Sequence, residues 1–199
     1  TWDIHPDLLI QLGETTQKKA DSDHWANTDA KGIVELFHER GYRARHVVIT
    51  DINADRLRLA SQVAPSVRTV NVAQEDLRDV IHQLGMKQGF DVGLEMSGSQ
   101  AALDQMVEAL VMGGKIALLG IPPGKSPVDW SRIVFKAITI KGVYGREMFE
   151  TWYKMIAMLQ NGLDVSRVIT HHFDVADFKE GFAAMKSGKS GKVVLDWRR

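Results

Sequence analysis

From residue 45 onward, short apolar runs alternate with segments whose apolar residues recur every three or four positions. The runs predict β-strands at 46–51, 66–72, 90–98 and 115–124. The periodic segments predict helices at 53–64, 73–85 and 99–114, with Asn53 as an N-cap and Gly113 and Gly114 as a helix stop. Strands that alternate with helices of this length indicate right-handed βαβ crossovers, so the predicted fold class is α/β with a Rossmann-like, doubly wound parallel sheet.

The rhythm changes after residue 124. We predict a short helix and a strand within 129–145, a long helix over 146–162, and a strand, a helix and a strand over 166–175, 177–188 and 190–197. Nearer the N-terminus, 5–13 is compatible with a strand or a short helix, and 30–41 with a helix. We therefore expect a divergent segment ending in a helix (1–43), a Rossmann-like domain (44–165) and a C-terminal strand–helix extension (166–199).

Composition excludes several kinds of protein. The formal net charge is zero, so neither nucleic acid nor a membrane surface is an expected partner. The absence of cysteine removes disulfides, thiolate zinc sites and cysteine nucleophiles. No apolar run approaches the roughly 20 residues of a membrane span, and the N-terminus lacks a signal-peptide pattern. We expect a cytoplasmic chain, and because it begins with Thr1 rather than Met, one that is processed, truncated or part of something longer.

Asp51 ends the strand "HVVITD" and is the first candidate site residue. In a doubly wound fold, an acid at the end of the second strand accepts hydrogen bonds from the adenosine ribose of a dinucleotide, and it repels the 2′-phosphate of NADP. Asp51 would equally suit a helix-leading acid favoured by the helix dipole. Arg56 lies one turn into the next helix, where it would reach the ribose or adenine, or simply face solvent.

The phosphate-binding loop that should precede such an acid is not recognisable. A glycine-rich G-x-G-x-x-G turn is expected about 20 residues earlier, where its backbone can approach a pyrophosphate. The sequence there is "WANTDAKGI", in which only Gly32 would serve, and Asp29 would repel phosphate. We therefore expect the sheet to be incomplete at its N-terminal edge, without the loop and without the strand before it.

Two further strands end in small-residue turns, "LEMSG" (94–98) and "LLGIPPG" (118–124). Ligands of parallel sheets bind at the carboxyl ends of the strands, and small residues there admit a flat ring. The alternative is that both are ordinary tight turns. The seven histidines show no metal-binding spacing, and the neighbours His171 and His172 would face opposite sides of a strand, so we expect them to be surface or hydrogen-bonded residues.

Five runs resemble the zinc-dependent L-threonine 3-dehydrogenase family of medium-chain dehydrogenases. They are "ARHVVITDIN", "GFDVGLEMSG", "GGKIALLGIPP", "IKGVYGREMFETWYKM" and "SGKVVLDW". The resemblance covers about residue 44 to the end. It implies that Asp51 and Arg56 bind NAD, together with the segment Leu119, Gly120 and Ile121 and the pair Val143 and Tyr144. It also implies oxidation of L-threonine to 2-amino-3-oxobutanoate with hydride passing to NAD, and an oligomer that associates through its cofactor domains.

The same resemblance sets limits on this chain. The family's zinc ligands and proton-relay histidine lie in an N-terminal catalytic domain that is not recognisable here, so we assign no catalytic and no metal-binding residue. On this reading 44–165 is the NAD-binding domain, and 166–199 is the segment that in the family packs back on the catalytic domain. We expect weakened or lost NAD binding and no activity from the chain alone. A non-catalytic assembly module is the alternative, while a methyltransferase would not explain "YGREMFETWYKM".

Overall fold

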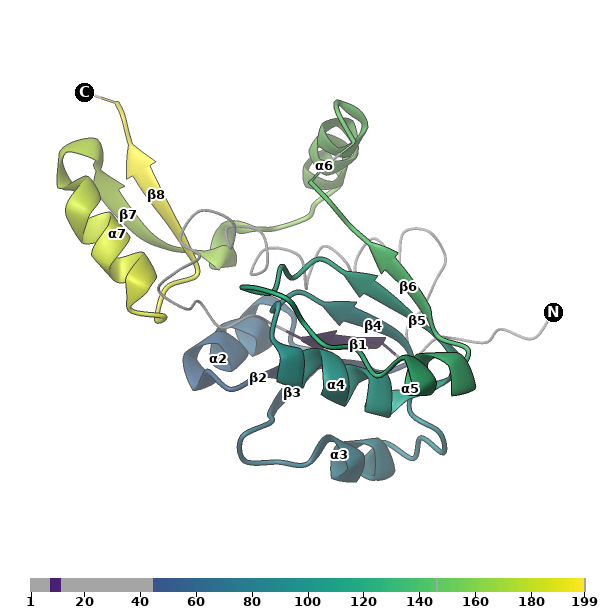
Figure 1. Cartoon of the computed structure of the whole chain (residues 1–199). Helices are drawn as coiled ribbons and strands as arrows, with labels where there is room; N and C mark the ends of the chain where they lie inside the picture. The colour runs from purple at the N-terminus through teal and green to yellow at the C-terminus, as the bar shows by residue number, and fades with distance from the viewer. Residues whose placement is uncertain (1–7, 12–44, 146, 199) are drawn as a thin grey trace.

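A computed structural model describes residues 8–11, 45–145 and 147–198 and contains a six-stranded parallel sheet. The strand order is β3-β2-β1-β4-β5-β6, the order of a doubly wound dinucleotide-binding fold. The predicted fold class is therefore confirmed (Figure 1). The strands are β1 Leu8–Gln11, β2 Val47–Asp51, β3 Arg68–Asn71, β4 Phe90–Glu95, β5 Leu110–Leu118 and β6 Thr139–Gly142.

The first strand corrects one expectation. We predicted that the strand before the phosphate loop was missing, but β1 lies in the centre of the sheet, with Leu9 opposite Val48 of β2 and Gly93 of β4. A three-residue apolar run is too short to distinguish strand from helix by periodicity. Its partners decide the matter, because an empty slot between β2 and β4 would leave two rows of backbone groups without hydrogen bonds.

Helices cover both faces of the sheet. The neighbours Val48 and Ile49 of β2 are fully buried in two different apolar clusters, because adjacent strand residues point to opposite faces. The cluster around Val48 takes in side chains from α3 (Leu77–Gln83) and α4 (Gln100–Ala109), with α5 (Trp130–Phe135) at its border. The cluster around Ile49 is closed by α2 (Ala54–Val63), which begins at the predicted N-cap, Asn53.

One helix boundary was predicted wrongly. The helix expected over 99–114 ends at Ala109, and β5 starts at the next residue. Gly113 and Gly114, predicted as the helix stop, lie within that strand, where the pairing with β4 is irregular and Gly113 has a φ of +77°. Two glycines permit this irregularity as readily as they end a helix, so the sequence did not separate the two outcomes.

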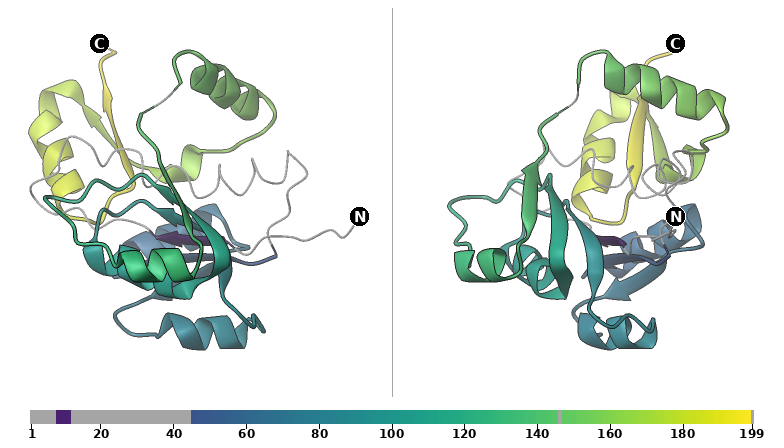
Figure 2. Two further views of the ribbon diagram at one scale, coloured as in Figure 1. Left: turned by 45° about the vertical axis from the view of Figure 1, so that its right-hand side comes forward. Right: turned by 90° about the vertical axis from the view of Figure 1, so that its right-hand side faces the viewer.

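The last part of the chain forms a second, smaller unit, called here the C-terminal unit (residues 166–198). It has two parallel strands, β7 Ile169–Asp174 and β8 Lys192–Asp196, joined by α7 Phe178–Lys186, with short 3₁₀ turns at Ser166–Val168 and Val175–Asp177. This matches the strand, helix and strand predicted from residue 166. Figures 1 and 2 show the unit beside α2, and α6 (Glu150–Gln160) standing apart beyond β6.

Candidate functional site

Asp51 and Arg56 form a buried ion pair at the carboxyl end of β2. Asp51 Oδ2 lies 3.5 Å from Arg56 Nη1, and the side chains are only 1% and 4% exposed. Asp51 Oδ1 accepts a hydrogen bond of 2.8 Å from the backbone N–H of Asn53. The helix cap is Asn53 rather than Asp51, and Asp51 lies two residues before it, where the helix dipole also favours a carboxylate. Arg56 does not face solvent, which excludes the alternative for that residue.

Ile52 lies between Asp51 and the helix cap Asn53, and it is more exposed than the ion pair. Its apolar side chain is 47% exposed, directly beside a buried carboxylate. An exposed branched side chain beside a buried carboxylate offers a flat apolar ring a surface to lie on. The sequence analysis did not single out Ile52, although its position between Asp51 and the N-cap was the available signal.

Glu95 is a second buried acid at the same edge of the sheet, and the sequence analysis missed it. It ends β4, is 1% exposed, and its Oε1 accepts hydrogen bonds from the backbone N–H groups of Ser97 (2.8 Å) and Gly98 (3.0 Å), and from the Ser97 hydroxyl. The signal was present, because "GLE" repeats the apolar-run-then-acid pattern of "VITD". These backbone N–H groups bind the Glu95 carboxylate, so Glu95 fixes the turn that follows β4.

The predicted segment 119–121 is tied to that turn. The N–H groups of Leu119 and Gly120 both donate to the Glu95 carbonyl oxygen, at 2.8 and 3.0 Å. A Cβ on Gly120 would overlap the Gly98 nitrogen and the Glu95 carboxylate, so only glycine lets these two turns touch. The turns after β4 and β5 are therefore one packed structure, not two separate loops.

The remaining predicted residues lie at the outer end of the same edge. The Val143 N–H donates to the Leu118 carbonyl oxygen at 2.9 Å, which places it beside the 119–121 segment. Tyr144 is 95% exposed, and Ile121 and Val143 are also exposed. The structure thus brings the predicted residues together in two groups, Asp51 with Arg56 and the 119–121 segment with Val143.

One strand separates these groups. Gln11, the last residue of β1, pairs with Thr50 on one side and Glu95 on the other. Since neighbouring strands are about 4.8 Å apart, the ends of β2 and β4 lie roughly 10 Å from each other across β1. The stretch "WANTDAKGI", where a phosphate-binding loop is expected, and the helix predicted at 30–41 come later in the sequence than β1 and lie outside the described residues.

The described residues do not fit a zinc site. Among residues 8–11, 45–145 and 147–198, no group of three or more His, Asp or Glu side chains is placed to hold a metal ion. His171 and His172 occupy neighbouring positions of β7, and His171 Nδ1 lies 2.8 Å from the Thr170 hydroxyl. His5, His24 and His38 lie outside the described part of the chain.

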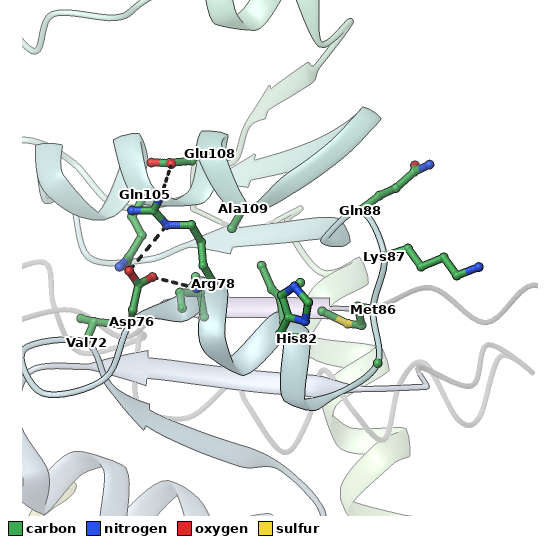
Figure 3. Close-up of a pocket in the computed structure, with 13 residues that line it drawn as sticks. Val72, Asp76, Arg78, His82, Met86, Lys87, Gln88, Gln105, Glu108 and Ala109 are labelled. Carbon is green, nitrogen blue, oxygen red and sulfur yellow. Dashed lines mark hydrogen bonds and ion pairs between the residues drawn. The ribbon is translucent and has the colours of Figure 1, made fainter.

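A separate groove of about 880 Å³ runs between α3 and α4, away from the strand ends. Arg78 lies in the middle of its wall (Figure 3), and its guanidinium nitrogens are 3.5 Å from the Asp76 carboxylate and 3.9 Å from that of Glu108. His82 and Lys87 lie farther along the rim, and Met86 contributes an apolar surface. The charged groups Asp76, Arg78 and Glu108 pair with one another. The groove therefore does not present a set of side chains directed at one bound ligand.

The strand order, the buried acid at the end of β2 and the glycine-dependent turns after β4 and β5 together define a doubly wound cofactor-binding domain. The family model described as zinc-binding dehydrogenase matches residues 33–161. The chain belongs to the zinc-binding dehydrogenase family. Among the described residues, no helix combines the length and apolar character needed to cross a bilayer.

Relatives with curated names are L-threonine 3-dehydrogenases, as the resemblance implied. The Ruegeria pomeroyi protein is 88% identical over 166 residues, which are 83% of this chain and 48% of that protein. The Chromobacterium violaceum protein is 58% identical over 167 residues, or 84% of this chain and 49% of the relative. The chain thus spans about half the length of the curated relatives it matches.

Solved structures agree on the fold. The 2R,3R-butanediol dehydrogenase of Bacillus subtilis superposes with a TM-score of 0.76 at 16% identity, over 98% of this chain and 51% of that one. A short chain alcohol dehydrogenase from E. coli CFT073, complexed with NADH, gives a TM-score of 0.75 at 19% identity, over 97% and 52% of the two chains. At these identities the likeness concerns the fold alone.

Proposed function

We propose that this chain is the cofactor-binding portion of an NAD-dependent L-threonine 3-dehydrogenase. The complete enzyme would oxidise L-threonine to 2-amino-3-oxobutanoate and pass the hydride to NAD. The relatives named for this activity support the substrate, and the sheet topology supports the role of this portion. A cytoplasmic location belongs to the same proposal, since a chain without cysteine suits a reducing compartment.

The observation that carries the proposal is the Asp51–Arg56 pair at the carboxyl end of β2. A carboxylate there would accept hydrogen bonds from the two ribose hydroxyls of adenosine, and it would repel a 2′-phosphate. The Arg56 guanidinium already lies against the Asp51 carboxylate inside the buried pair. It would therefore not bind the 2′-phosphate of NADP. The pair therefore favours NAD over NADP, and Ile52 would carry the adenine.

The nicotinamide end would lie over the joined turns after β4 and β5. Gly98 and Gly120 present backbone rather than side chains there, which permits a flat ring to approach closely. Leu119, Gly120, Ile121, Val143 and Tyr144 would surround the ring. When bound, NAD supplies the hydride acceptor, and the residues of this chain would orient it.

We propose that the chain alone binds NAD weakly and does not oxidise threonine. The side chain of Asp51 is almost completely buried, so neighbouring atoms must move before a ribose can contact it. That rearrangement costs binding free energy. The sequence also lacks the glycine-rich loop for the pyrophosphate, and the described residues lack a zinc site. In the complete enzyme a zinc ion would polarise the substrate alcohol, and we propose that its ligands lie outside the described residues.

Calorimetric titration with NAD tests the binding, and the absorbance of NADH tests the chemistry. We expect a dissociation constant weaker than about 1 µM and no threonine-dependent NADH, with or without added zinc. A tighter dissociation constant, or NADH formed from threonine by the purified chain, would contradict the proposal.

A second candidate function is homo-oligomeric assembly. β6 is the last strand at one edge of the sheet, and α6 contains no buried residue although Trp152, Tyr153 and Ile156 are large and apolar. An open sheet edge and an exposed apolar helix are both disfavoured on a monomer. We propose that a second copy of the chain covers them, so that the cofactor portion also serves as an assembly module.

A further inference from the structure

The C-terminal unit holds α2, the helix that carries Arg56, at three places. At the start of the helix, Asn53 Nδ2 donates a hydrogen bond of 3.0 Å to the Gly188 carbonyl oxygen. At its end, Arg167 Nη1 donates one of 2.9 Å to the Gln62 carbonyl oxygen. Between them Gly191 packs so closely that a Cβ there would lie 2.7 Å from the Leu59 side chain.

Asn53 joins this contact to the nucleotide-binding pair. Its backbone N–H donates to Asp51 Oδ1 at 2.8 Å, and its side-chain Oδ1 accepts from the N–H groups of Asp55 and Arg56, at 2.9 and 3.3 Å. Every polar atom of its side chain is thus used: the oxygen caps α2 and the nitrogen reaches the C-terminal unit. Gly188 has a φ of +70°, which presents its carbonyl to Asn53 in a backbone conformation that glycine adopts without strain.

We infer that Asn53 is a positioning residue that couples nucleotide binding at Asp51 and Arg56 to the docking of the C-terminal unit on α2. This inference rests on the proposed function, since it concerns the site to which we assign NAD. Arg56 is placed against Asp51 by the start of α2, and the start of α2 is held by Asn53. A change in how the C-terminal unit sits on Asn53 therefore changes the geometry that the ribose meets.

Coupling of this kind is reciprocal. If the docked C-terminal unit improves the geometry of the pair, then bound NAD must stabilise the docked unit by the same free energy. The segment 187–191 would exchange its amide hydrogens more slowly with NAD than without it.

Three variants separate this role from simple helix capping. Asn53→Ser keeps an oxygen that caps α2 but is too short to reach Gly188. Arg167→Ala cuts the other end of the contact, far from the nucleotide. Asn161→Ser is the matched control, because the Asn161 side chain donates only to Ala157 within its own helix.

Hydrogen exchange by mass spectrometry and NAD titration are measured on each variant of the whole chain. Loss of one hydrogen bond is expected to weaken NAD binding about 3- to 10-fold in Asn53→Ser and to speed exchange in 187–191. Arg167→Ala should change both in the same direction, and Asn161→Ser neither. Exchange at 54–57 should stay unchanged in Asn53→Ser, because the cap is preserved.

Two results are decisive against the inference. The first is an amide-exchange rate in 187–191 that is the same in Asn53→Ser as in the control Asn161→Ser. The second is NAD binding that is weakened in Asn53→Ser but not in Arg167→Ala. If the unaltered chain shows no NAD binding, the proposed function fails and the coupling fails with it. The contact of Asn53 with the C-terminal unit is still decided in that case by the exchange rates without NAD.

Discussion

Asp51 and Arg56, which we propose as the ribose-binding pair, also affect stability, because their opposite charges lie together out of water. Replacing one partner of a buried ion pair removes an attraction that offsets the cost of burying the other charge, and this usually costs more than the pair itself contributes. A substitution in this pair is therefore expected to change the free energy of unfolding as well as the candidate site.

Asp51→Asn should lower the free energy of unfolding by about 3 kcal/mol, because Arg56 would remain buried opposite a neutral amide. Chemical denaturation followed by circular dichroism measures the change. Asp55→Asn is the control, since Asp55 pairs with Arg58 at the surface, and it should change stability by less than about 0.5 kcal/mol. Equal changes in the free energy of unfolding for the two variants would mean that the buried Asp51–Arg56 pair does not stabilise the fold more than a surface pair.

Gly120→Ala should destabilise the chain by about 1–3 kcal/mol, because the added methyl group meets the Gly98 backbone and the Glu95 carboxylate. Gly124→Ala, four residues later, adds a methyl group with no atom within 4 Å. The difference in melting temperature between these two variants measures the contact between the turns. A Gly120→Ala protein as stable as Gly124→Ala would show that the two turns are not packed together.

The residues that sequence reasoning could find were those whose role is local. Asp51 is the last residue of its strand and Arg56 lies in the first turn of the next helix, so spacing alone suggested both. Glu95 has the same local pattern, but its importance comes from the amides two and three residues on and from Gly120, which lies in the turn after another strand. The link from Asn53 to Gly188 crosses 135 residues, and no periodicity encodes a contact of that kind.

At the scale of elements, the end of α4 depends on a side chain from the far end of α5. Lys136 Nζ donates hydrogen bonds to three backbone carbonyl oxygens there, those of Val107 (3.0 Å), Glu108 (2.7 Å) and Leu110 (2.8 Å). The last carbonyl groups of a helix have no partners within the helix, and an ammonium group suits the negative end of its dipole. The helix can therefore end at Ala109 without a glycine cap.

Lys136→Met should lower the free energy of unfolding by about 1–3 kcal/mol, because three carbonyl groups lose a charged donor while the apolar stem is kept. Thermal denaturation measures the effect, and Lys125→Met at an exposed position is the control. If both variants melt at the same temperature, the ammonium does not stabilise the end of α4.

This contact also explains the boundary that was predicted wrongly. The sequence shows a helical pattern up to two glycines, and a glycine stop is the ordinary local interpretation. Lys136, 22 positions after Gly114 in the sequence, supplies the cap instead, so the helix ends earlier and the glycines enter β5. The parallel sheet as a whole was predictable, since it depends on alternating patterns that each element carries by itself.

At the scale of the whole molecule, a six-stranded sheet and the C-terminal unit are joined through α2, and an apolar surface is left open on α6. The chain covers about half of each curated relative. A sheet edge and an apolar helix exposed together are the features that association would cover.

Trp152→Lys should shift the chain from dimer toward monomer in light scattering, because a charge would be placed in the surface that the second copy covers. Lys179→Glu, a charge change on α7 of the C-terminal unit, should leave the mass unchanged. A monomeric unaltered chain would contradict the proposed assembly, and a dimer unaffected by Trp152→Lys would place the interface elsewhere.

The most direct test of the central claim, that the end of β2 is an NAD-specific ribose site, is one calorimetric comparison. NAD and NADP are titrated into the unaltered chain and into Asp51→Asn, at concentrations where both proteins remain folded. We expect the unaltered chain to bind NAD at least about tenfold more tightly than NADP, a difference of about 1.4 kcal/mol, and Asp51→Asn to lose this preference. Equal affinities for the two dinucleotides in the unaltered chain, or a preference that survives in Asp51→Asn, would contradict the claim.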